Sequence, residues 1–92
     1  MEAYSFNPFK SKLNEQLRGI DFAMVVDFEW ETALITQDLR QDYLENRYQA
    51  LGFIGKYLHM LVFTPRKGLI HVISLRRANQ RERKRYATQT KP

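Results

Sequence analysis

The sequence contains no cysteine, and only four glycines and three prolines occur among its 92 residues. The lack of cysteine excludes a disulfide framework, a thiolate metal site and a thiol nucleophile. The scarcity of glycine and proline excludes collagen-like and low-complexity chains. No apolar run approaches the roughly 20 residues that cross a membrane, and the first residues lack the features of a secretory signal. We therefore expect a cytoplasmic protein with no membrane contact.

The remaining composition is that of an ordinary globular protein, with 43% hydrophobic and 27% charged residues. The length matches one domain, which we expect to span residues 1–92. Charge is divided unevenly along it. Residues 1–46 carry four basic and nine acidic side chains, a balance of −5, whereas residues 47–92 carry eleven basic and one acidic side chain, a balance of +10. This asymmetry favours a polyanionic partner, above all nucleic acid, over a basic surface that serves only solubility.

Local signals predict an α+β fold in which two N-terminal helices pack on one face of a mainly antiparallel sheet, followed by a short C-terminal helix. The expected strands lie at 2–6, 33–37, 45–53, 57–64 and 69–75. The residues at 65–68 suit a tight hairpin turn, which makes the last strands an antiparallel meander.

The first helix begins at Asn7-Pro8, where Asn suits the cap and Pro the first helical position, and it ends at Gly19. Three apolar residues four positions apart form one stripe of this helix: Phe9, Leu13 and Leu17. We expect this helix and the next to cover the sheet.

A second helix is expected at about 22–30, capped by Asp21, with Phe22, Val25 and Val26 on one face. Trp30 should close the core at its end. Asn79 and Glu82 have the spacing of a capping box that starts the last helix. That helix has few apolar residues, so we expect it to dock loosely.

Several segments occur in the order and spacing of one known family. They are residues 7–10, 19–22, 45–52, 61–66 and 73–78, the last followed by Arg81-Glu82-Arg83 and Tyr86. The set resembles the BrnT toxins over nearly the whole chain. Two positions depart from the family pattern: Arg18 stands where the family often has His, and the acidic pair before the strand arginine is reduced to Glu45-Asn46.

The resemblance implies a bacterial type II toxin with a RelE-like fold, a ribonuclease that cleaves RNA without a metal or other cofactor and inhibits translation. It also implies neutralisation by a small BrnA-like antitoxin with a ribbon-helix-helix domain, in a heterotetramer that represses its own operon. The toxin would then reach DNA only through the antitoxin. The alternative is a module of the same fold that binds nucleic acid or antitoxin without cutting.

Cleavage of RNA without a metal needs a base for the 2′-hydroxyl, cations for the phosphorane and an acid for the leaving oxygen. Arginine suits the second role because its planar fork matches two phosphate oxygens. The candidates that match the family pattern are Arg47, Arg66, Arg76 and Arg77. Neighbours on a strand point to opposite faces, so only one of Arg76 and Arg77 can face the active surface. The alternative for each arginine is a surface ion pair.

Glu45 is the best candidate base, expected on the same strand face as Arg47. Tyr86 could serve as the acid or stack on a base, and its alternative role is to anchor the last helix. The basic residues expected to bind RNA are Arg77, Arg81, Arg83, Lys84 and Arg85.

The two histidines receive weaker assignments. His59 lies among apolar residues and is expected in the core, and His71 alternates with apolar residues on the last strand. Either could titrate near neutral pH. No cluster of residues has metal-ligand spacing, so we expect no metal site.

Overall fold

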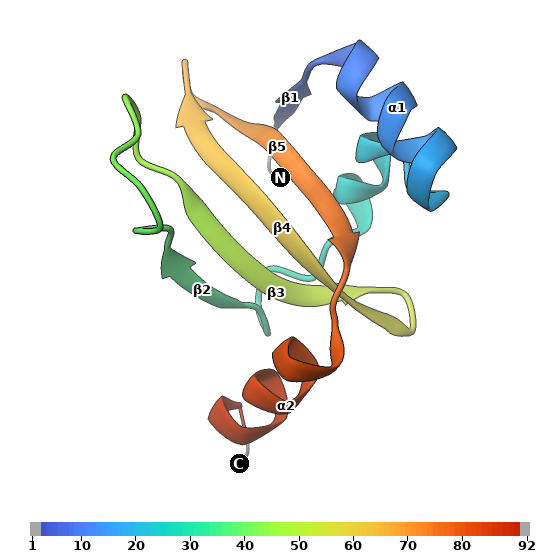
Figure 1. Cartoon of the computed structure of the whole chain (residues 1–92), viewed down its shortest axis with the longest axis vertical. Coiled ribbons are helices and arrows are strands. Elements are labelled where there is room, and N and C mark those ends of the chain that lie inside the picture. Colours follow the sequence, from blue (N-terminus) through green and yellow to red (C-terminus); the bar gives the residue numbers. More distant parts are fainter. Residues whose placement is uncertain (1–2, 91–92) are drawn as a thin grey trace.

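Five strands form one mixed sheet in the computed structural model, which describes residues 3–90 (Figure 1). The elements in chain order are β1 (Tyr4–Phe6), α1 (Pro8–Arg18), the 3₁₀ helix η1 (Phe22–Asp27), β2 (Leu34–Gln37), β3 (Tyr48–Ile54), β4 (Tyr57–Arg66), β5 (Leu69–Arg77) and α2 (Gln80–Gln89). The strand order is β1-β5-β4-β3-β2. Strands β2 to β5 form an antiparallel meander, and β1 pairs in parallel with β5. The α+β class and the mainly antiparallel sheet are confirmed.

The strand predictions differ from the structure mainly at β3. This strand begins at Tyr48, three residues later than expected, so Glu45 and Arg47 lie in the connection before it. The Thr64 hydroxyl donates to the Asn46 carbonyl at 2.7 Å, so that carbonyl is held by a side chain rather than by a ladder amide. The expected first strand is β1, and residue 2 of that prediction lies outside the described residues.

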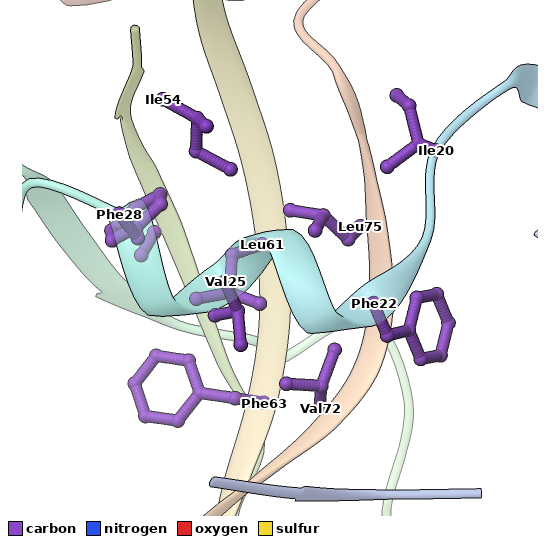
Figure 2. Close-up of a cluster of buried hydrophobic side chains, with 10 residues drawn as sticks. Ile20, Phe22, Val25, Phe28, Ile54, Leu61, Phe63, Val72 and Leu75 are labelled. Carbon is purple, nitrogen blue, oxygen red and sulfur yellow. The ribbon is translucent and has the colours of Figure 1, made fainter. Parts of the chain in front are cut away.

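One face of the sheet, here called the first face, is covered by η1 across β3, β4 and β5. Figure 2 shows η1 crossing the strands with the buried cluster against it. Its fully or nearly fully buried members are Ile20, Phe22, Val25, Phe28, Ala50, Ile54, Leu61, Phe63, Val72 and Leu75. Trp30 packs against this cluster, with its ring edge-on to Phe28 and Phe63 and its indole N–H donated to the Tyr4 hydroxyl. The predicted packing role of Trp30 is confirmed.

The predicted second α-helix at 22–30 is wrong, because the segment forms the short 3₁₀ helix η1. Asp21 caps it as expected, accepting from the Ala23 amide at 2.8 Å. A 3₁₀ helix has three residues per turn, so every third side chain points the same way. Phe22, Val25 and Phe28 follow this period toward the sheet, while Val26 is 68% exposed. Packing against the sheet selects this period over the α-helical one.

Helix α1 begins and ends where expected, but its apolar side faces solvent and its polar side faces the rest of the protein. The Asn7 side chain accepts from the Phe9 amide, and Gly19 takes the left-handed conformation with φ 72°. Its inward face is polar: Ser11 is buried, and the Asn14 amide donates to the Ile20 and Leu75 carbonyls at 2.8 Å each. The predicted apolar stripe points outward, and its members are 87%, 53% and 74% exposed in the order Phe9, Leu13, Leu17. The prediction that this stripe packs on the sheet is wrong, because η1 already fills that face.

The opposite face of the sheet, here called the second face, carries a smaller apolar cluster. Its buried members are Leu51, Leu58, Met60, Val62 and Ala78. Helix α2 begins with the predicted capping box between Asn79 and Glu82. None of its residues is fully buried, which agrees with the expected loose docking. Within the described residues, no helix has the length and apolar character needed to cross a membrane.

Candidate functional site

On the second face, β4 changes from apolar to polar toward its end, and the facing residues of β5 are polar. Residues directly opposite one another on paired strands share a face. Met60, Val62 and Thr64 lie opposite three polar residues of β5, namely Arg76, Ser74 and His71 in that order. Alternation along β4 places Arg66 on the same face. One side of the sheet therefore gathers two arginines, a histidine and a serine.

Arg66 pairs with Glu45 across the end of β4. One terminal nitrogen of the guanidinium lies 3.0 and 3.1 Å from the two carboxylate oxygens. The Arg66 side chain is 45% exposed and that of Glu45 34%, so the pair is accessible to a ligand. The expectation that Glu45 shares a strand face with Arg47 is wrong, because both residues precede β3 and the chain turns Glu45 toward Arg66.

Arg47 lies immediately before β3, with its guanidinium carbon 4.2 Å from the centre of the Tyr43 ring. Its Nε is buried and finds no hydrogen-bond partner among residues 3–90. A buried donor without a partner is uncommon in folded proteins and is a feature that needs an explanation.

Sequence reasoning missed a polar network in the connection between β2 and β3. The Asp38 carboxylate is fully buried and accepts from the Arg40 guanidinium at 2.8 and 2.7 Å and from the Tyr43 hydroxyl at 3.2 Å. The Arg40 hydrogen bonds lower the pKa of Asp38 to about 2. This network shapes the loop that carries Arg47. The only sequence signal was an Asp, an Arg and a Tyr within six residues of a predicted loop.

Arg76 and Arg77 point to opposite faces, as predicted. Arg76 donates from two nitrogens to the two oxygens of Glu82, each at 2.8 Å, and this pair raises the pKa of Arg76 and lowers that of Glu82. It ties β5 to the first turn of α2. Arg77 lies on the other side, with its guanidinium carbon 3.7 Å from the centre of the Tyr57 ring.

The basic residues of α2 have different surroundings. Arg81, Arg83 and Lys84 are exposed, although Arg83 also donates to the Ala78 carbonyl at 3.0 Å. The Nε of Arg85 is buried and has no hydrogen-bond partner in the described part of the chain. The Tyr86 hydroxyl donates to the Thr32 carbonyl at 2.8 Å, and its ring packs edge-on to Phe53. These are the contacts of an anchor for α2, the alternative that the sequence had left open.

The two histidines differ in their surroundings. His59 is buried, and its Nδ1 lies 2.8 Å from the Tyr57 carbonyl; burial lowers its pKa. This confirms a satisfied core histidine. His71 is only half-buried, and its Nδ1 lies 2.9 Å from the Ser5 hydroxyl of β1. Burial lowers the pKa of His71, and the charges of Arg66 and Lys10 lower it further.

Arg18, the position that departs from the family pattern, is exposed in the last turn of α1. It is therefore at the end of the helix away from Lys10 and His71. Across residues 3–90, no three His, Asp or Glu side chains are arranged so that they could hold a metal ion.

Comparison with known proteins gives one finding about the family. A search of curated protein sequences finds no significant match. The model of the family described as the ribonuclease toxin BrnT of type II toxin-antitoxin systems matches residues 6–82. The match contains the last residue of β1, all of α1, η1 and β2 to β5, and the first turn of α2, so it includes Arg66 and His71 of the second face. Such a system pairs the toxin with an antitoxin and has RNA as its substrate, and this chain belongs to the BrnT family of ribonuclease toxins.

Proposed function

We propose that the chain is a metal-independent endoribonuclease that inhibits translation by cutting cytoplasmic RNA on the second face of a RelE-like sheet. The observation that carries this proposal is that Arg66 and Arg76 lie on the same face of the sheet. Cleavage within RNA develops negative charge on the phosphorane, and fixed arginines in a partly desolvated site stabilise that charge most effectively.

Each arginine has a distinct part in this proposal. Arg66 is accessible, and Glu45 holds its guanidinium in place while leaving other donor positions of the fork free. Arg47 precedes β3 with its guanidinium over the Tyr43 ring, and its terminal nitrogens are the donors proposed to meet a phosphate oxygen. Arg76 meets the RNA backbone further along β5, at the junction with α2.

The basic residues beside this face bind the flanking RNA without cutting it. The exposed side chains of α2 supply most of this charge, and Arg77 adds to it from the other side of the sheet: Arg77, Arg81, Arg83, Lys84 and Arg85. Binding through phosphates releases counterions, so the affinity for RNA falls steeply as the salt concentration rises.

Neutralisation requires the antitoxin to block RNA. We propose a ribbon-helix-helix antitoxin, in a heterotetramer, that covers the second face and the basic surface of α2, and that contacts DNA on behalf of the complex. An antitoxin complex in which Arg66 and Arg76 remain open to solvent would contradict this arrangement.

The test uses the purified full chain, without antitoxin, on total RNA in EDTA. We expect cleavage that yields 2′,3′-cyclic phosphate ends and that is lost in Arg66→Ala and Arg76→Ala. Arg18→Ala, which changes an exposed arginine of α1, is the matched control and should cleave normally. Intact RNA in all samples, with salt-sensitive binding retained, would instead establish a binding module without catalysis.

A further inference from the structure

Because Glu45 is paired with Arg66, the reaction needs another residue as its proton acceptor. Both oxygens of the Glu45 carboxylate accept from the Arg66 guanidinium, at 3.0 and 3.1 Å, so this carboxylate is engaged in holding Arg66 in place. Another group on the second face must then take the proton from the 2′-hydroxyl. His71 is the one histidine that lies on this face.

We propose that His71 is the general base of RNA cleavage and that Ser5 is its positioning residue. The proposal rests on the ribonuclease function proposed above and names the residue that acts as its base. Its geometric support is the position of His71 directly opposite Thr64, on the same face as Arg66, and its 2.9 Å contact with Ser5.

The Ser5 contact determines which ring nitrogen can accept a proton. Neutral imidazole carries one N–H and one lone pair, and a hydrogen bond at one nitrogen selects the tautomer. In the productive arrangement Nδ1–H donates to the Ser5 hydroxyl oxygen, which leaves the lone pair of Nε2 free for substrate. β1 pairs in parallel with β5, with Ser5 directly opposite His71, so the sheet itself holds the two residues together.

The reaction step balances as an internal transesterification. Nε2 takes the proton of the 2′-hydroxyl, the 2′-oxygen forms a bond to phosphorus, and the bond from phosphorus to the 5′-oxygen breaks. The products are a 2′,3′-cyclic phosphate and a 5′-hydroxyl, whose proton comes from water. Arg66 stabilises the phosphorane, and the imidazolium later returns its proton to solvent.

The charges around His71 come from three elements. Lys10 of α1 and Arg66 of β4 lower its pKa in addition to the larger effect of burial, whereas Glu45 of the connecting loop raises it. A lowered pKa keeps the imidazole neutral, and therefore able to accept a proton, at neutral pH. The acid limb of the pH profile should then lie below the ordinary histidine value of 6.5.

The experiment measures single-turnover cleavage of total RNA in EDTA, together with RNA affinity, from pH 5 to pH 8. We expect His71→Ala to lose roughly 10²–10⁴-fold in rate, to keep its RNA affinity within about twofold, and to lose the acid limb. Added imidazole should restore part of the rate. His71→Gln, which can still hydrogen-bond Ser5, guards against a loss that is due only to misfolding.

Ser5→Ala separates positioning from structure. We expect about a tenfold lower kcat with an unchanged KM, and a change in the tautomer of His71 in its ¹⁵N NMR signals, with His59 as the internal reference. Lys10→Gln should move the acid limb to higher pH and Glu45→Gln should move it to lower pH, because the two charges act on His71 with opposite sign.

The outcomes are distinguishable. If the wild-type chain cleaves RNA and His71→Ala retains most of the rate, the base is another residue and the ribonuclease function stands. If Glu45→Gln abolishes cleavage while His71→Ala retains most of the rate and the acid limb, Glu45 is the base instead. If the wild-type chain leaves RNA intact under all conditions, the proposed function fails and His71 has no reaction to serve.

Discussion

The two faces of the sheet use the same strands for different purposes. On the first face, the inward residues of β3, β4 and β5 that lie under η1 are apolar, and the polar pair His59 and Arg77 lies only at the end where β4 begins. On the second face, β4 is apolar at Leu58, Met60 and Val62 and then changes to Thr64 and Arg66. On β4, the polar residues of the second face are thus confined to the end of the strand, whereas β5 carries polar residues of that face at Arg76, Ser74 and His71.

This difference teaches how a small chain holds a reactive surface rigidly. The side chains of Arg66 and His71 alternate along their strands with residues of the buried first face, such as Phe63 and Val72. Displacing them would disturb the core on the opposite side, and cores resist such changes because they are close-packed. Catalytic groups on strands are held more precisely than groups on loops for this reason.

The strongest way to test the comparison is to change the same residue type on each face. Arg66→Ala should lower RNA cleavage about 10²–10³-fold, because it removes a donor that stabilises the phosphorane. Arg77→Ala, on the other face, should change the cleavage rate less than threefold and mainly reduce RNA affinity. Quantitative cleavage assays with circular dichroism of both variants provide the measurement; equal losses in the two variants would remove the distinction between the faces.

The connection between β2 and β3 is stabilised by the buried carboxylate of Asp38. Arg40→Ala should lower the free energy of unfolding by about 1.5–3 kcal/mol, because Asp38 loses two charged hydrogen bonds while remaining buried. Asp38 has a lowered pKa, so this contribution is complete above its ordinary value of 3.8 and disappears as the pH falls toward about 2. Urea unfolding at several pH values measures it. Arg18→Ala is the control, and a difference that persists at pH 2 would contradict the account.

The packing of the first face is tested at the close contact between Gly52 and Phe28. Gly52 lies under the ring of Phe28, and a Cβ there would come within 2.5 Å of a ring carbon. Gly52→Ala should therefore destabilise the fold by about 1–3 kcal/mol, measured by urea unfolding. The double variant with Phe28→Leu should show a smaller penalty than the sum of the two single changes; strict additivity would mean that the ring moves freely.

The smallest expected effect concerns Tyr86, which lies at the boundary between the second face and α2. Tyr86→Phe removes a hydrogen bond to the Thr32 carbonyl and should cost about 0.5–1.5 kcal/mol of unfolding free energy. Because the hydroxyl is used as an anchor, the cleavage rate should stay within about twofold. A loss of tenfold or more with normal stability would restore Tyr86 as the acid of the reaction.

The features that were predictable from the sequence depend on neighbours in the chain. The caps at Asn7 and at Asn79 with Glu82 join atoms within three residues, so their spacing alone is sufficient. The meander was predictable for a similar reason, because alternation and a Pro-Arg-Lys-Gly turn join adjacent strands.

The features that were not predictable depend on competition between distant segments. Both α1 and η1 carry apolar residues, and nothing in the local pattern shows that η1 takes the sheet and leaves the stripe of α1 outside. The partner of Glu45 lies 21 residues away, at a position that follows from the start of β3 and the register of β3 with β4. A prediction that began this strand three residues early assigned Glu45 the wrong neighbour.

The outward stripe of α1 has a consequence for the hierarchy of local unfolding. Since α1 is attached by directional contacts such as those of Ser11 and Asn14, water can replace much of what holds it. Its amides, and those of the short β1, should exchange with solvent at lower opening free energies than those of β4. Each such opening separates Ser5 from His71. The fraction of molecules in which the His71 imidazole is correctly oriented therefore depends on how often α1 and β1 open.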